Sequence, residues 1–172
     1  GFGGYAPDLF PVPQTDPPVQ PAGYAFAIWG VIYLWLLVGA GFGLLARARA
    51  VDWMPMRLPL AASVGIGAAW LPVASVSPLA ATALIWLMLA TALIAMVRAP
   101  ALDLWFARAP VALYAGWLTA ASCVSLGLLL AGYGLMSQTG AAILSLLLAL
   151  ALSIWVLRFR GNFPQFGFAV VW

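Results

Sequence analysis

The sequence predicts an all-α protein, a polytopic bundle of transmembrane helices. Its 172 residues are 66% apolar and only 6% charged, with a mean hydropathy of +1.08. Soluble domains carry about 25% charged residues, so this chain lacks the polar surface that a domain needs in water. It also contains five apolar runs of the length that crosses a bilayer, about 20 residues each. These observations predict an integral membrane protein.

The expected spans are bounded by arginine, proline and glycine. They cover residues 22–46, 58–76, 79–97, 110–132 and 141–157. Residues 163–172 turn apolar again but are too few to cross a bilayer. We therefore expect a further, partial span there, and a natural polypeptide that extends beyond both ends of the sequence.

Residues 1–21 form an extended, proline-rich segment of a different kind, which bears Asp8 and Asp16. Such a segment is typical of a solvated linker. Tyr5, Leu9 and Phe10 also allow it to lie over the mouth of the bundle. Both interpretations stay open from the sequence.

The arginines orient the bundle because all seven fall on one side of an alternating topology. They are Arg47, Arg49, Arg57, Arg98, Arg108, Arg158 and Arg160. Basic residues are enriched in the cytoplasmic loops of membrane proteins. We therefore expect the arginine-bearing loops to be cytoplasmic and residues 1–21 to be non-cytoplasmic.

The residue types exclude several classes of function. Histidine is absent and Cys123 is the one cysteine, which excludes an internal disulfide and histidine or multi-cysteine metal sites. Ion-coupled transport requires ionisable residues within the membrane, and no such residue lies deep in an expected span. No base is available to activate a nucleophile, and no basic cluster fits nucleic acid. We expect no catalytic residues, no metal site and no nucleic-acid partner.

Two helical faces combine aromatic and small side chains. Phe26, Trp29 and Tyr33 follow the i, i+3, i+7 spacing of one face of a helix. A second face is formed by Tyr114, Trp117, Ala121 and Ser125. If the faces meet, they form a slot suited to a planar conjugated ring or a sterol- or polyene-like ligand.

Other patterns are explained without a ligand. Trp53, Trp105 and Trp155 lie near the arginine-side ends of the expected helices, where interfacial tryptophan is common. Gly39 and Gly43 form a small-xxx-small pair, which allows helices to approach closely.

The chain resembles the TspO/translocator-protein family, also called tryptophan-rich sensory proteins, and more closely its longer bacterial relatives. Three blocks carry the resemblance, in family order. They are Pro21-x-Gly23-Tyr24-x-Phe26-x-x-Trp29-x-x-x-Tyr33, Trp70-Leu-Pro72-Val and Tyr114-x-x-Trp117-x-x-x-Ala121. Gly67 and Ser125 stand where the family usually has asparagine, so two polar groups of the family pocket are missing.

The resemblance implies a five-helix core that binds porphyrins and hydrophobic small molecules in an aromatic pocket, in the bacterial inner membrane. The family's first helix would lie before Gly1, and the fifth and partial spans would be additions. The expected ligand-binding residues are Phe26, Trp29, Tyr33, Trp70, Tyr114, Trp117, Ala121 and Ser125. A tetrapyrrole or a carotenoid is the candidate bound group.

Three functions stay open. The first is a receptor, carrier or sensor for a tetrapyrrole, carotenoid or sterol-like lipid, with membrane lipids as its surroundings. The second is an accessory structural subunit of a larger photosynthetic or respiratory membrane complex, with other membrane subunits or a homodimer as partners. The third and least favoured is light-driven porphyrin degradation through tryptophan radicals, which some relatives suggest.

Overall fold

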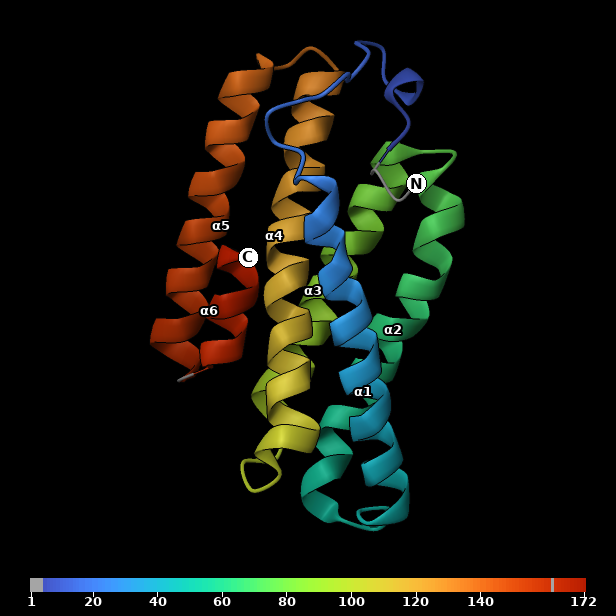
Figure 1. Ribbon diagram of the computed structural model, residues 1–172, viewed down its shortest axis with the longest axis vertical. Helices are drawn as coiled ribbons and strands as arrows, with labels where there is room; N and C mark the ends of the chain where they lie inside the picture. Colours follow the sequence, from blue (N-terminus) through green and yellow to red (C-terminus); the bar gives the residue numbers. More distant parts are fainter. Residues whose placement is uncertain (1–4, 162) are drawn as a thin grey trace.

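Five long helices run side by side in the computed structural model, and a shorter helix packs against them (Figure 1). The structure describes residues 5–161 and 163–172. All five long helices are long and apolar enough to cross a membrane. The predicted fold class, a polytopic transmembrane α-helical bundle, is confirmed.

The helices follow one another with short connections. The long helices are α1 (Ile28–Leu45), α2 (Met54–Ala74), α3 (Pro78–Arg98), α4 (Ala109–Gly132) and α5 (Gln138–Arg160). Short helical turns are η1 (Pro7–Leu9), η2 (Gly23–Ala27), η3 (Val51–Trp53) and η4 (Leu104–Arg108). The last helix is α6 (Pro164–Val171). The expected partial span is thus a helix of eight residues.

Local chemistry sets several of these boundaries. The hydroxyls of Ser77 and Ser137 accept hydrogen bonds from the amides of Ala80 and Gly140, which caps the first turns of α3 and α5. Pro78 begins α3, where the missing amide proton costs nothing. Gly161 adopts a φ of 111°, which suits glycine and reverses the chain between α5 and α6.

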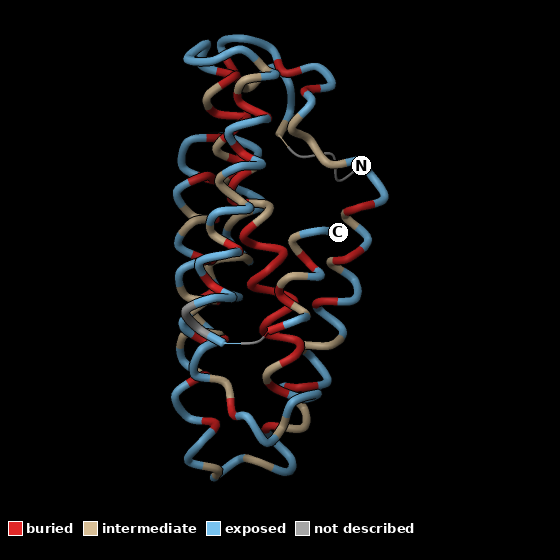
Figure 2. Tube along the Cα trace, turned by 90° about the vertical axis from the view of Figure 1, so that its left-hand side faces the viewer, coloured by how far each residue is buried: buried red, intermediate tan, exposed pale blue. Residues whose placement is uncertain are grey.

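Helix α4 forms the centre of the bundle. Most of its residues are buried, and α1, α3, α5 and α6 pack around it. Helix α2 packs along α3 instead, at the side of the bundle. Figure 2 shows buried residues within the bundle and exposed residues along the outer sides of the helices. The apolar outer surface is consistent with a lipid environment.

The short helix α6 turns back into the bundle and lies against α4. Gly116 permits the approach, because a Cβ atom there would collide with the backbone carbonyl of Phe166. At the end of α6, the Trp172 indole donates a hydrogen bond to the carbonyl oxygen of Ala25, at 3.1 Å. The Trp172 ring also meets that of Tyr24 edge to face. Residues far apart in sequence therefore meet at the start of α1.

Residues 5–20, here called the strap, cross one end of the bundle (Figure 1). We call this end the strap end, and the opposite end, which carries the arginines, the arginine end. Phe10 is 4% exposed and packs with Leu128 and Leu129. The amide of Val12 donates to the carbonyl oxygen of Gly132, at 2.9 Å. Of the two interpretations of this segment, the structure shows the one in which it lies over the bundle.

A candidate ligand groove and its aromatic wall

The two predicted aromatic faces meet in an aromatic cluster between α1 and α4. Trp29 and Tyr33 stack with ring centroids 5.1 Å apart and planes 14° apart. Trp117 meets the rings of Phe26 and Trp29 edge to face, at 6.3 and 6.1 Å. Tyr114 lies 6.3 Å from Trp29. The cluster contains Phe26, Trp29, Tyr33, Tyr114 and Trp117, five of the eight residues expected to bind ligand.

The polar atoms of the cluster differ in their partners. The Tyr114 hydroxyl shares a 2.9 Å hydrogen bond with Ser63, which donates to the carbonyl oxygen of Met88 at 2.8 Å. The Trp117 indole N–H has no hydrogen-bond partner among the described residues, although Trp117 is only 4% exposed. A buried indole usually finds a partner. Trp117 is therefore held by ring packing.

The other three expected residues lie outside the aromatic cluster. Trp70 on α2 packs against the ring of Tyr5 and donates to the carbonyl oxygen of Ala81, at 2.9 Å. The Ser125 hydroxyl bonds those of Tyr5 and Thr82, and we call these three residues the hydroxyl cluster. Ala121 is half-buried against the main core. The eight residues thus divide between the aromatic cluster, the hydroxyl cluster and the core.

A groove of about 510 Å³ lies in the half of the bundle nearer the arginine end, and its volume is within the range of about 300–1,000 Å³ usual for small-molecule sites. Helices α1, α2 and α4 and the turn η4 form its walls. Its lining consists of Tyr33, Leu36, Leu37, Gly39, Ala40, Gly43, Leu44, Trp53, Met56, Arg57, Leu60, Ala61, Val64, Phe106, Ala107, Pro110 and Val111. Tyr33 alone belongs both to this lining and to the expected site, so the groove begins where the aromatic cluster ends.

Small residues of α1 set the width of the groove. A Cβ atom on Gly39 would collide with the carbonyl oxygen of Phe106, and one on Gly43 would lie 2.8 Å from the Trp53 ring. The small-xxx-small pair therefore holds η4 and Trp53 close to α1, where they close the lower part of the groove. Such close contacts replace the hydrophobic drive that lipid does not supply.

An ion pair fixes the arginine end below the groove. Asp103 accepts hydrogen bonds from Arg47 at 2.9 and 3.1 Å and from the Trp53 indole at 2.8 Å. These donors lower the pKa of the Asp103 carboxyl, and Asp103 in turn raises the pKa of Arg47. Trp53 lies at the arginine-side helix end as expected, but its side chain is 3% exposed and packs within the protein. Trp105 is 62% exposed and fits that expectation.

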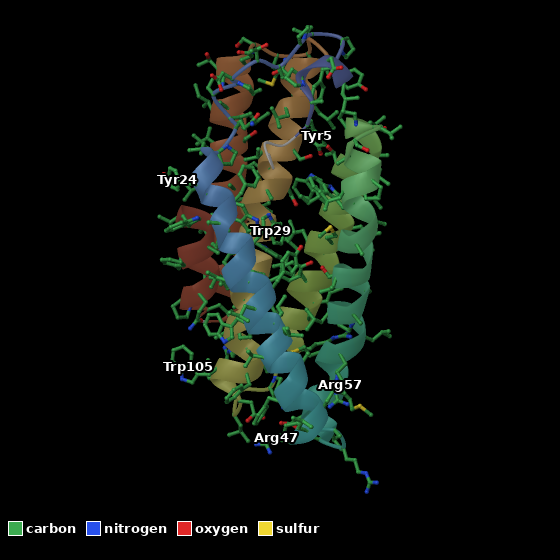
Figure 3. All side chains as sticks on the ribbon, turned by 45° about the vertical axis from the view of Figure 1, so that its right-hand side comes forward. Tyr5, Tyr24, Trp29, Arg47, Arg57 and Trp105 are labelled. Carbon is green, nitrogen blue, oxygen red and sulfur yellow. The ribbon has the colours of Figure 1, made fainter. Side chains whose placement is uncertain are left out.

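Arg57 closes the same end through backbone contacts. Its guanidinium donates to the carbonyl oxygens of Arg47 at 2.7 Å, Ala48 at 3.0 Å and Gly43 at 3.4 Å. These carbonyls lie at or just beyond the C-terminus of α1, where helix carbonyls lack partners within the helix. Figure 3 shows Arg47 and Arg57 at one end of the bundle, with Trp29 between them and Tyr5.

Comparison with known protein families gives a match over most of the chain. The model of a family described as TSPO-like protein matches residues 13–172. The chain belongs to this family. No curated protein and no solved structure matches the chain. The match to the TSPO-like family confirms the resemblance inferred from the sequence and covers all five long helices, α6 and part of the strap.

Some residues of the candidate site were not found from the sequence. Ser63, Thr82 and Tyr5 supply polar contacts, while Trp53 and Phe106 line the groove. A signal existed for Ser63 and Thr82, because each is a hydroxyl residue inside an apolar span. From the sequence, Tyr5 is expected only to help the N-terminal segment lie over the bundle, and nothing in the sequence distinguishes Phe106 from the other aromatic residues.

Proposed function

We propose that this TSPO-like protein is a non-enzymatic receptor or carrier for an apolar planar or polyene ligand, such as a tetrapyrrole, a carotenoid or a sterol-like lipid. The observation that supports the proposal is the groove of about 510 Å³ between α1 and α2. We further propose that it works in the bacterial inner membrane, with the arginine end cytoplasmic.

The groove joins the aromatic cluster through one side chain. Tyr33 lines the groove, is 49% exposed and stacks on Trp29. Since Trp29 covers one face of the Tyr33 ring, the other face is available to a ligand. An additional stacked ring contributes about 0.5–1.5 kcal/mol beyond its buried area. A ligand in the groove would therefore extend the aromatic stack that the protein already contains.

The membrane environment favours rigid ligands over flexible ones. A ligand that enters from the bilayer leaves one apolar medium for another, so apolar burial contributes little to its affinity. Binding must then come from close packing and ring stacking. Each rotatable group that becomes ordered costs free energy. A planar ring or a polyene is thus expected to compete with the acyl chains of lipids, which must lose more conformational freedom.

The test uses the purified protein in lipid nanodiscs, titrated with protoporphyrin IX and, separately, with β-carotene. Quenching of tryptophan fluorescence reports binding. Ala61→Phe fills the groove from α2 and is expected to weaken binding at least tenfold. Ala69→Phe is the matched control, because Ala69 is an exposed alanine of the same helix outside the groove lining. Tyr33→Leu is expected to weaken binding a few-fold through loss of stacking.

The result that contradicts the proposal is equal quenching in the wild type, Ala61→Phe and Ala69→Phe proteins. Such a result would mean that the pigments dissolve in the lipid around the protein. Trp29→Leu tests the aromatic cluster separately. If it leaves binding unchanged while Ala61→Phe weakens it, the ligand occupies the groove without reaching Trp29.

A second candidate, an accessory subunit of a larger photosynthetic or respiratory complex, is favoured by the outer face of α2. Gly65, Ala68 and Ala69 are exposed there, and a Cβ atom on Gly65 would touch nothing within 4 Å. Small residues facing lipid are typical of contacts between membrane helices. Co-migration with a pigment or redox complex on native gels would support this function. A ligand-responsive monomer or homodimer would argue against it.

A further inference from the structure

We infer that Ser125, Thr82 and Trp70 form a binding site for a phenol, and that Tyr5 of the strap occupies this site as a tethered ligand. The inference rests on the proposed function in one respect, namely that apolar ligands reach the bundle from the membrane. It adds two points to that function. The ligand is a phenol that binds at Trp70 and Ser125, and this ligand competes with the strap.

The hydroxyl contacts define the polar half of the site. Ser125 and Thr82 are 3% and 5% exposed, and their hydroxyl oxygens lie 2.6 Å apart. The Tyr5 hydroxyl lies 2.5 Å from that of Ser125 and 3.4 Å from that of Thr82. A buried hydroxyl in apolar surroundings is costly without a partner. Ser125 and Thr82 bond each other, which uses one of their two O–H hydrogens, and the Tyr5 oxygen lies within reach of the other as an acceptor.

The ring contacts define the apolar half. The Tyr5 ring centroid lies 6.1 Å from that of Trp70 and 5.8 Å from that of Phe10. Phe10 belongs to the strap, whereas Trp70 belongs to the bundle. The Trp70 ring is held in place by its hydrogen bond to Ala81. Helices α2, α3 and α4 thus present a prepared surface of one ring and two hydroxyls to a phenol.

The rest of the strap has its own attachment, so Tyr5 can leave alone. Phe10 packs on Leu128 and Leu129, and the Val12 amide bonds the carbonyl of Gly132. Between Tyr5 and Phe10, the residues Pro7 and Asp8 are exposed. Among the described residues, the contacts of the Tyr5 side chain are neutral hydrogen bonds and ring packing. A free molecule with the same ring and hydroxyl can reproduce them.

These contacts specify the ligand class. The partners are hydroxyls and an indole face, so a phenol or quinol headgroup fits, with an apolar tail that remains in the membrane. An ionised carboxylate or amine would bury a charge without a counter-charge, which is strongly unfavourable. Since a tethered group acts at an effective concentration of roughly millimolar, Tyr5 sets a threshold that the free phenol must exceed.

The experiment compares 4-nonylphenol with nonylbenzene, which lacks only the hydroxyl, on the full chain in nanodiscs. Equilibrium binding of the tritiated compounds is measured. We expect Tyr5→Ala to bind 4-nonylphenol about tenfold or more tightly than the wild type, with nonylbenzene unchanged. Tyr133→Ala is the control, because it removes another strap-end phenol, whose ring meets Phe10 and which is not among the hydrogen-bond partners of the hydroxyl cluster in the described part of the chain. Ser125→Ala with Thr82→Val should abolish the preference for the phenol.

A second measurement keeps the inference testable if Tyr5→Ala is poorly folded. A fluorophore at Asp8→Cys, in a Cys123→Ala background, reports mobility near Tyr5 with the tyrosine intact. 4-Nonylphenol should lower its anisotropy and nonylbenzene should not. Equal effects of the two compounds, or equal affinities of the Tyr5→Ala and Tyr133→Ala proteins for 4-nonylphenol, would overturn the inference. Protoporphyrin binding that remains sensitive to Ala61→Phe would then show that the proposed function stands without it.

Discussion

The two ends of the bundle are closed by different chemistry. At the arginine end, Asp103 holds Arg47 and Trp53, and Arg57 binds carbonyls at the end of α1. At the strap end, Phe10 lies among leucines and Tyr5 bonds two hydroxyls. The arginine end uses charge and backbone contacts within the helical framework. The strap end uses neutral contacts made by a segment that is mostly not helical.

This difference indicates where the molecule can open. At the arginine end, Arg57 of α2 bonds carbonyls at the C-terminus of α1, so separating these groups would require a helix to move. The strap-end groups belong to residues 5–20, which can leave while the helices stay in place. Local opening of this kind costs less than global unfolding. We therefore expect the strap end to open more readily than the arginine end.

The largest expected effect is at the strap end. Phe10→Ala removes a buried ring, a change that costs about 3–5 kcal/mol in a well-packed site. We expect the strap to open, with amide-exchange protection of residues 5–20 falling by about two orders of magnitude and that of α4 unchanged. Hydrogen–deuterium exchange with mass spectrometry measures both. Val12→Ala is the control, because Val12 is 45% exposed; similar losses in the two variants would contradict the assigned role of Phe10.

The next effect concerns the arginine end. Gly39→Val places a side chain against the Phe106 carbonyl, and overpacking of this kind costs about 1–3 kcal/mol. We expect a lower unfolding temperature in detergent. Gly41→Val is the matched control on the same helix, since a Cβ atom there meets nothing within 4 Å. If both variants melt alike, the close approach of η4 to α1 is wrong.

A smaller effect is expected from pH. The pKa of Asp103 is lowered in the folded protein, chiefly by its hydrogen bond from Arg47. Its contribution to stability is therefore present above the unfolded pKa of about 3.9 and is lost as pH falls through the folded pKa. We expect the unfolding temperature of Asp103→Asn to lie below that of the wild type at neutral pH.

On acidification, the gap between the two proteins should close. The comparison is a series of melting curves from pH 7 to pH 2.5. Asp52→Asn serves as the control, because Asp52 affects Arg47 only through a minor charge interaction. A gap between wild type and Asp103→Asn that persists at the lowest pH would rule out the ion pair as its cause.

The smallest effect separates the half-buried Trp70 from the buried Trp117. Trp70→Phe deletes a hydrogen bond to Ala81 and leaves that carbonyl with one partner fewer, a loss of about 0.5–1.5 kcal/mol. Trp117→Phe deletes an N–H that has no partner among the described residues. Because both changes remove similar ring area, we expect Trp117→Phe to destabilise the protein less. Calorimetric unfolding of the two variants tests the order, and the reverse order would indicate a hidden partner for Trp117.

The bundle could be predicted well from the sequence, because helices that cross a bilayer must be long and apolar and their connecting loops carry the arginines. The sequence also placed Phe26, Trp29 and Tyr33 on one face, since helix periodicity sets that spacing. It could not show that these rings fill the space between α1 and α4 by packing on one another. Nor could it locate the groove, whose position depends on the close contact between the backbone of η4 and Gly39 of α1. Tertiary contacts, including that of Asp103 with Trp53, leave no local pattern.

The hydrogen bond from Trp172 to Ala25 joins residues that are 147 positions apart. Contacts of such long range bring a large loop-closure entropy and form late in folding. During membrane insertion, the first turn of α1 therefore makes its full set of contacts only after α4 and then α6 have been inserted. Until then, the polar backbone near Ala25 faces lipid headgroups or water, and the early bundle is open to proteases and to association with other helices.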